Sequence, residues 1–275
     1  MTVGYGIYLP PFGPFGDPRD LVELARRAEA AGWDGVFLWD HVTGARSPIV
    51  DTWSTLAAMT QVTERLRLGP MVTPLPRRRP WVVARQAATV SRLSGGRLVL
   101  GAGLGSDETG DFGAFGEQTG ERLRSARLDE GLGLVRRIWA GEEIRHEGEH
   151  YRVSLDATTP EPHPLPIWIG SSTGHPRVLE RAARADGIFP NPGERTLTPD
   201  DVCGLAAAMP RDRPFDIVVR GNASPAWDEP QHADLAGLAE AGMTWWLESL
   251  FWLDSLELSM QVVDAGPPGP LGTRP

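Results

Sequence analysis

Eight short apolar segments recur along this chain, most of them at a similar spacing, and this pattern constrains the fold more than any other feature. The segments are continuously apolar and rich in β-branched and aromatic residues, which is typical of strands covered on both faces. Most of their starts lie roughly 30 residues apart, the length of one strand with its helix. They begin near Val3, Asp34, Leu66, Arg97, Pro166, Asp186, Phe215 and Thr244.

Helix signals fill several of the intervals between these segments. An acidic cap followed by proline, Asp17-Pro18, predicts a helix start, and an apolar stripe then runs to Gly32. A second helix is expected from Pro80 to the glycines at 95–96, and a long one over residues 121–140. Strands therefore alternate with helices along most of the chain.

This alternation predicts an α/β protein with a parallel sheet. Eight units of similar length favour closure into a single (β/α)8 barrel, the TIM barrel, over residues 1–265. The fourth interval is much longer than the others and holds a small insertion between strands 4 and 5, residues 143–165, which is expected to form a hairpin and a proline-rich connector. The Gly- and Pro-rich residues 266–275 are predicted to be a flexible tail.

The charged residues exclude several functions. All 27 basic residues are arginine, so the chain lacks the lysine that a Schiff-base aldolase, a pyridoxal-phosphate enzyme or a P-loop NTPase needs. A net charge of −9 argues against nucleic acid as the main partner. The single cysteine, Cys203, excludes an internal disulfide and a multi-cysteine metal site. The one dense basic run, residues 77–79, is interpreted as a solvated loop.

The sequence also gives expectations about location. No apolar run approaches the roughly 20 residues that a membrane helix needs. No basic head precedes an apolar stretch near residue 1, so no secretory signal is evident. We therefore expect a cytoplasmic protein that binds neither membrane nor nucleic acid.

In a barrel of this kind the active site lies at the carboxyl ends of the strands. Asp40-His41 follows strand 2, and His41 is the best candidate for proton chemistry because imidazole titrates near neutrality. The alternative is that His41 only satisfies backbone groups in its loop. No metal-ligand pattern such as His-Glu-x-x-His occurs, so no metal site is predicted. Glu108 and Glu248 could be imagined as the carboxylate pair of a barrel hydrolase, but their spacing does not support that role.

Two glycine-rich stretches also lie at the ends of predicted strands. Residues 101–105 (GAGLG) could let a flat ring lie against the backbone, because glycine has no side chain to obstruct it. Residues 170–174 (GSSTG) precede a helix, and free amides and hydroxyls there suit a phosphate. An ordinary helix-capping turn is the alternative for the second stretch.

Several of these motifs together resemble the luciferase-like monooxygenase family. The resemblance covers about residues 1–265, and the Leu-Ser-Gly-Gly-Arg stretch with its glycine-rich strand is quite specific to the family. The family includes bacterial luciferase, alkane monooxygenases and oxidoreductases that use coenzyme F420. The matching motifs are residues 69–74 (GPMVTP), 79–80 (RP), 93–97 (LSGGR), 101–105 (GAGLG), 31–34 (AGWD), 39–41 (WDH), 112–116 (FGAFG), 166–170 (PIWIG) and 182–187 (AARADG).

The resemblance implies a TIM barrel that binds FMN or coenzyme F420 at its carboxyl face. Family members carry a non-proline cis peptide at the end of strand 3, which maps to Met71 and Val72. His41 matches the histidine near the reactive face, and either Arg122 or Arg124 could reach the cofactor phosphate. The residues expected to contact the cofactor are Asp40, Met71, Val72, Gly103, Gly105, Ser106, Gly170, Ser171 and Ser172.

The resemblance leaves the reaction open. It implies either FMN-dependent monooxygenation, with reduced flavin from a separate reductase, or F420-dependent hydride transfer; a homodimer is common in the family. Sugar-phosphate dehydrogenases of the family carry a glutamate where Ser106 stands here, and they use lysines that this chain lacks. A catalytically silent flavin-binding barrel is a further alternative. An apolar or aromatic substrate is expected from the aromatic residues predicted at the rim: Tyr8, Phe12, Trp39, Trp227 and Trp246.

Overall fold

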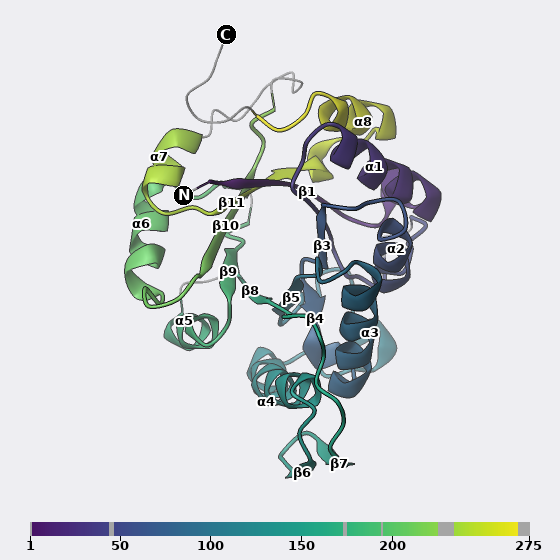
Figure 1. Ribbon diagram of the computed structural model, residues 1–275, viewed down its shortest axis with the longest axis vertical. Helices are drawn as coiled ribbons and strands as arrows, with labels where there is room; N and C mark the ends of the chain where they lie inside the picture. Colours follow the sequence, from purple (N-terminus) through teal and green to yellow (C-terminus); the bar gives the residue numbers. More distant parts are fainter. Residues whose placement is uncertain (1, 44–46, 173–174, 194, 225–233, 269–275) are drawn as a thin grey trace.

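All eight predicted strands form, and they pair in parallel as one ring (Figure 1). The computed structural model describes residues 2–43, 47–172, 175–193, 195–224 and 234–268. The third predicted strand is split into two segments. The barrel strands are β1 (Gly4–Leu9), β2 (Gly35–Leu38), β3 (Arg67–Pro70), β4 (Thr73–Pro74), β5 (Leu100–Gly103), β8 (Ile167–Ser171), β9 (Gly187–Pro190), β10 (Asp216–Gly221) and β11 (Trp245–Ser249).

The sheet closes on itself at the split strand. Its order is β3-β2-β1-β11-β10-β9-β8-β5-β4, and all of these pairs are parallel. Since β3 and β4 are two parts of one strand, a parallel bridge from Leu68 to Leu98 joins the two ends of this order. The ring therefore has eight positions, and β10 lies across the barrel from β3 and β4. The predicted TIM barrel is confirmed.

Helices form the outer layer of the barrel in Figure 1. The predicted cap of the first helix is present: the Asp17 side chain accepts a hydrogen bond from the Arg19 backbone N–H at 2.9 Å. The helices are α1 (Pro18–Ala30), α2 (Thr52–Met59), α3 (Pro80–Leu93), α4 (Glu121–Trp139), α5 (Pro176–Ala183), α6 (Pro199–Ala208), α7 (Leu235–Glu240) and α8 (Leu256–Asp264), with 3₁₀ turns η1 (Gly13–Phe15), η2 (Leu75–Arg77), η3 (Gly113–Phe115) and η4 (Leu250–Trp252). None of the described helices combines the length and apolarity that a membrane crossing requires.

The apolar core has two parts. The larger part lies between the sheet and the helices, and the smaller one fills the inside of the barrel. Because side chains plug the barrel interior, a small molecule is expected at the rim, at the carboxyl ends of the strands, and not inside the barrel. The inner part consists of Tyr8, Phe37, Met71, Val99, Trp168, Phe189, Val218 and Leu247.

The insertion between strands 4 and 5 is the predicted hairpin. Its strands, β6 (Ile144–Glu147) and β7 (Arg152–Leu155), pair antiparallel and lie beside α4 in Figure 1. Glu130 of α4 holds the hairpin by accepting hydrogen bonds from the backbone N–H groups of His150 and Tyr151, at 3.0 and 2.9 Å. Of the predicted tail, residues 269–275 lie outside the described residues.

A bulge separates β3 from β4, and glycines on the two neighbouring strands surround its side chain. The peptide bond between Met71 and Val72 is cis, as the resemblance predicted. A Cβ atom on Gly103 would lie 2.7 Å from a Val72 methyl group, and one on Gly170 would lie 2.6 Å from the other. These glycines therefore make room for the Val72 side chain, which is half-buried at the rim.

The crowding around Val72 gives a stability prediction. Gly170→Ala should lower the free energy of unfolding by about 1–3 kcal/mol, because its methyl group overlaps Val72. The double variant with Val72→Ala should recover part of that loss. Chemical denaturation of the purified variants measures both effects.

Gly133→Ala is the matched control. Gly133 lies exposed on α4 with nothing within 4 Å of the added methyl group, so this change should be neutral or stabilise by up to about 1 kcal/mol. An equal loss of stability in both alanine variants would contradict the role given to Gly170.

Candidate active site at the barrel rim

His41 lies three residues beyond the end of β2, at the carboxyl end of the barrel. Its side chain is 20% exposed, and its Nδ1 contacts the carboxylate of Asp111. Asp111 comes from the loop between β5 and η3 and is 1% exposed. The same carboxylate accepts hydrogen bonds from the backbone N–H groups of Val42 and Thr43, at 2.8 and 3.1 Å. Asp111 therefore fixes both the imidazole and the loop that carries it.

The environment of Asp111 keeps it ionised. Burial raises the pKa of this carboxyl, but the hydrogen bonds from His41 and from the Val42 N–H, with the charges of His41 and Arg77, outweigh burial and lower the pKa to about 2. A carboxylate at Nδ1 favours the tautomer that is protonated there. Nε2 of His41 is the ring nitrogen that does not contact Asp111.

Asp40 points into the protein, where it binds two arginines. Its side chain is 1% exposed and accepts hydrogen bonds from Thr73 Oγ1 at 2.8 Å and from Arg78 Nη2 at 2.7 Å. Arg77 lies 3.3 Å from Asp40 and 3.3 Å from Asp111. Asp40 therefore ties the end of β2 to β4, directly beside the bulge.

The prediction of a solvated loop at residues 77–79 is wrong for two of its three arginines. The side chains of Arg77 and Arg78 are only 7% and 17% exposed, whereas Arg79 is exposed. The reason is that two buried carboxylates, Asp40 and Asp111, require compensating charge. The run of arginines supplies it.

Two predicted substrate residues, Phe12 and Trp39, contact His41, and the third, Tyr8, contacts Trp39. The Phe12 and Trp39 rings lie 5.8 and 5.7 Å from the imidazole, and Tyr8 lies 5.6 Å from Trp39. The structure therefore brings Tyr8, Phe12 and Trp39 together with the candidate proton donor. Their contact with a substrate stays a prediction.

The other two aromatic residues predicted at the rim are Trp246 and Trp227. Trp246 is fully buried, and its Nε1 donates to Glu248 at 2.8 Å, so the prediction that it lies at the rim is wrong. Its neighbour Leu247 points into the barrel, which turns Trp246 outward toward the helices. Trp227 lies outside the described residues.

The predicted cofactor residues on β5 and β8 lie at the ends of two neighbouring strands. Gly103 and Gly170 both pack against Val72, and Ser171 follows on β8. Ser172 is exposed just beyond that strand, and residues 173–174 lie outside the described residues. Gly105 and the exposed Ser106 continue the loop after β5.

The two candidate phosphate arginines differ in their surroundings. Arg124 is 6% exposed, donates to the Gly105 carbonyl at 2.8 Å and lies over the Phe112 ring at 4.8 Å. It therefore supports the loop after β5, whereas Arg122 is exposed.

The two carboxylates considered for a hydrolase do not form a matched pair. Glu248 is fully buried within β11, where it accepts hydrogen bonds from the Ala223 and Ser224 backbone N–H groups. Glu108 is exposed in the loop after β5. Glu248 therefore has a structural task, and the geometry does not favour the hydrolase.

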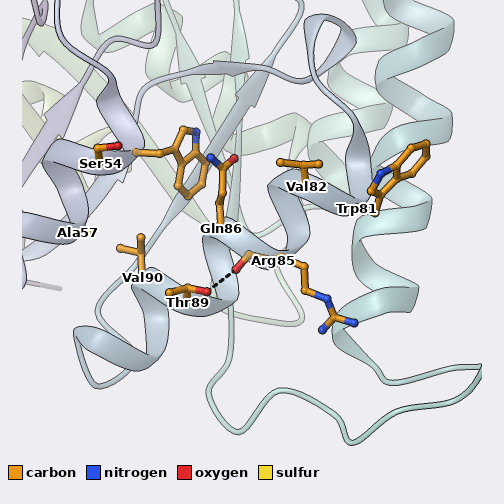
Figure 2. Close-up of a pocket in the computed structure, with 9 residues that line it drawn as sticks. Ser54, Ala57, Trp81, Val82, Arg85, Gln86, Thr89 and Val90 are labelled. Carbon is orange, nitrogen blue, oxygen red and sulfur yellow. Dashed lines mark hydrogen bonds between the residues drawn. The ribbon is translucent and has the colours of Figure 1, made fainter.

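A hollow of about 480 Å³ lies away from this rim, on the outer helices α2 and α3 (Figure 2). None of the predicted site residues lines it. The hollow is therefore separate from the candidate active site. Its lining residues are Trp53, Ser54, Ala57, Trp81, Val82, Arg85, Gln86, Thr89 and Val90.

Sequence reasoning missed Asp111, Arg77 and Arg78 as parts of the site. Asp111 is distant from His41 in the sequence, and only barrel closure brings the two loops together. A weak signal existed: an arginine run directly after the third strand, in a chain with acidic residues at other strand ends, could have been interpreted as charge compensation.

Comparison with known proteins agrees with this geometry. The family model described as luciferase-like monooxygenase matches residues 4–247. An F420-dependent glucose-6-phosphate dehydrogenase of Amycolatopsis mediterranei is 36% identical over 205 residues, and one of Intrasporangium calvum is 37% identical over 206. These matches cover 70% of this chain and 58% and 59% of the two relatives. The chain thus spans less than two thirds of the length of these relatives.

Solved structures share the fold. The coenzyme F420-dependent tetrahydromethanopterin reductase of Methanopyrus kandleri superposes with a TM-score of 0.72 at 15% identity, covering 96% of this chain and 97% of its own. An F420-dependent secondary alcohol dehydrogenase gives 0.74 at 16% identity, covering 96% and 99%. A monooxygenase from Streptomyces bottropensis gives 0.70 at 22% identity, covering 95% and 96%.

The low pKa of Asp111 predicts an acid dependence of stability. Because the folded pKa of about 2 lies below the ordinary value of 3.8, the ionised carboxylate stabilises the fold above pH 4, and this contribution disappears as the pH falls through 2. The shift corresponds to about 2 kcal/mol. Asp111→Asn should therefore be less stable than the wild type at pH 7, and the gap should narrow between pH 4 and pH 2.

Denaturant unfolding across this pH range measures the gap. Asp156→Asn, which alters an exposed hairpin carboxylate, serves as the control and should stay within about 0.5 kcal/mol of the wild type throughout. A pH-independent difference for Asp111→Asn would show that the carboxylate charge is not what stabilises the site.

Proposed function

The chain belongs to the luciferase-like monooxygenase family, and from that premise we propose that it is an oxidoreductase that uses coenzyme F420 or FMN. F420 is the first choice because the relatives at 36% and 37% identity named above are F420-dependent enzymes. The proposed reaction is hydride transfer to or from a small apolar or aromatic substrate. FMN-dependent monooxygenation is the alternative that the experiments below distinguish.

One observation carries this proposal: a proton-exchanging histidine and a bulged strand meet at the open end of a plugged barrel. Asp40 binds Thr73 at 2.8 Å, and the Met71 N–H donates to the Leu38 carbonyl at 2.6 Å. These bonds hold the loop of His41 against the bulge at Val72. A ring that rests on Val72 would therefore lie beside the imidazole.

The residues at the rim fit a flavin or deazaflavin. Val72 offers an apolar support between β5 and β8. The glycines on these two strands leave room for its side chain, and any larger residue in their place would displace Val72. Gly170, Ser171 and Ser172 lead from that support toward the start of α5, a suitable position for the phosphate. When bound, the cofactor supplies the redox centre: a hydride-carrying carbon in F420, or an oxygen-activating ring in reduced FMN.

His41 is proposed as the group that exchanges the proton. Asp111 holds Nδ1, which leaves Nε2 to donate to a developing alkoxide, or to accept from an alcohol in the reverse direction. Phe12 and Trp39 form an aromatic wall beside this position, and the ring of Tyr8 extends the wall beyond Trp39. The wall excludes water and orients an apolar substrate, which strengthens each polar contact inside.

The sugar-phosphate activity of the curated relatives is not carried over. This chain has no lysine to bind a sugar phosphate, and Ser106 replaces the expected glutamate. The aromatic wall around His41 favours an apolar or aromatic compound instead. A homodimer, a separate reductase and a cytoplasmic location are proposed on the family resemblance alone.

Cofactor titration is the primary test. F420 and FMN are added separately to the purified chain, and binding is followed by absorbance and fluorescence. Micromolar uptake of F420 would support hydride transfer, and selective uptake of reduced FMN would support monooxygenation. Uptake of neither cofactor would overturn the proposal, and uptake without turnover of any reduced cofactor would indicate a silent flavin-binding barrel.

Removing His41 should separate chemistry from binding. His41→Ala should retain cofactor affinity within about twofold and lose roughly 10²- to 10⁴-fold in kcat, the contribution of a positioned proton donor. His163→Ala, which removes a histidine from the proline-rich connector, should leave both quantities unchanged. Wild-type turnover in His41→Ala would remove this residue from the mechanism.

A negative charge introduced at the proposed phosphate loop should weaken the binding only of ligands that carry a phosphate. Ser172→Asp should weaken FMN binding by about tenfold or more through repulsion, while riboflavin, which lacks the phosphate, should bind as it does to the wild type. The same change at exposed Ser154 on β7 is the control. Equal weakening of both ligands would place the phosphate elsewhere.

A further inference from the structure

Arg220 lies on the inner face of the barrel rim, apart from the histidine and the bulge. It pairs in register with Leu247, whose side chain belongs to the barrel interior, and it follows Val218, another interior residue, by two positions. Side chains two apart on a strand share a face, so Arg220 points into the mouth. Its strand, β10, lies across the ring from the bulge at Val72.

The charge of this arginine is not balanced inside the described part of the molecule. Its Nε donates to Asn191 Oδ1 at 2.9 Å, and its Nη2 donates to the Gly193 carbonyl, so both acceptors are neutral. Burial lowers the pKa of its guanidinium, and no described carboxylate opposes that effect. Arg77, Arg78 and Arg181 each contact an aspartate, whereas Arg124, like Arg220, contacts only neutral groups among the described residues.

Other polar side chains share the inner face of the rim with Arg220. Ser249 and Asn222 occupy inward positions at the ends of β11 and β10, and they are 0% and 5% exposed. Each carries a side-chain oxygen without a hydrogen-bond partner among the described residues. Tyr8, which pairs in register with Ser249, is close enough for Arg220 to act on its phenol electrostatically. Buried polar atoms usually have a hydrogen-bond partner, from the protein, from ordered water or from a ligand, so the oxygens of Ser249 and Asn222 are free to contact a bound molecule.

We propose that Arg220, with Tyr8, Asn222 and Ser249, forms an oxyanion-binding subsite that recognises a carboxylate on the substrate. Arginine has five N–H donors, and only two hydrogen bonds are used here, so a bidentate contact with a carboxylate remains available. The substrate class is thus an apolar or aromatic carboxylic acid. This inference rests on the proposed function, since it assigns the substrate of the same site.

The position of Arg220 favours the substrate over the cofactor as the source of the anion. The proposed cofactor support lies on β4, β5 and β8, whereas Arg220, Ser249 and Tyr8 belong to β10, β11 and β1. These two groups of strands face each other across the mouth. A substrate carboxylate held by Arg220 would direct the apolar body of the molecule toward His41 and the ring.

The test compares benzoate with benzamide, which share one shape and differ in charge. Titrations of the purified chain are followed by the tryptophan indole N–H signals in NMR spectra, with and without saturating F420. Wild type should bind benzoate about tenfold or more tightly than benzamide, the difference expected for a charge-assisted contact. Arg220→Gln should abolish the preference, and Tyr8→Phe, which removes only a hydroxyl group, should reduce it about two- to fivefold.

Arg26→Gln, an exposed change on α1, is the control and should keep the wild-type preference. Far-ultraviolet circular dichroism and thermal melting verify that each variant is folded. Equal affinity for benzoate and benzamide in the wild type would overturn the subsite, whatever the F420 titration shows. A tenfold loss of F420 affinity in Arg220→Gln, with the benzoate preference retained, would assign the arginine to a cofactor anion instead and would also overturn it.

The two proposals can fail separately. A chain that binds F420 but does not distinguish the two probes retains the proposed function and loses the subsite. A chain that prefers benzoate through Arg220 but takes up neither F420 nor FMN retains the subsite and loses the redox function.

Discussion

The arrangement of the rim depends on a buried charge network in which two carboxylates face two arginines. Asp40 joins the end of β2 to Thr73 on β4, and Asp111 joins the loop after β5 to the loop of His41. Arg77 contacts both carboxylates. Removing one member would leave an unpaired charge in a region closed to water, which is strongly destabilising. The network therefore keeps three neighbouring strand ends in register with one another.

The interior of the barrel contributes to stability, whereas its rim carries the candidate active site. Large apolar side chains fill its interior, so the lower part of the barrel contributes packing and no open space. At the rim, packing gives way to a bulge whose Val72 side chain fits between Gly103 and Gly170. Because this fold accommodates many reactions, the fold alone does not identify one, and the assignment depends on the residues placed at the rim.

The rim itself is divided between two kinds of polar group. His41, which Asp111 holds, lies on the side of β2 and β5, next to the bulge, and is the proposed proton-exchanging group. Arg220 lies on β10, across the mouth, and carries a charge that no described carboxylate balances. Aromatic rings of Tyr8 and Trp39 lie between them. A molecule with an apolar body and one anionic end matches this order of groups.

The sequence by itself determined the barrel. Strand and helix signals are local, since each depends on residues within one turn or one strand, and eight strand–helix units of similar length left little choice of fold. The predicted hairpin, the cap at Asp17 and the bulge at Met71 and Val72 follow from the same local patterns and from the family resemblance. His41 could be selected because it directly follows a strand.

Only the tertiary structure decided which side chains surround His41. Asp111 approaches it from a loop that is distant in the sequence, and Arg77 and Arg78 are buried because two carboxylates lie beneath them. Trp246 was predicted at the rim, but side chains alternate between the two faces of its strand, and Trp246 points outward toward the helices. Such pairings depend on closure of the barrel, which brings distant strand ends together, and no local pattern in the chain records them.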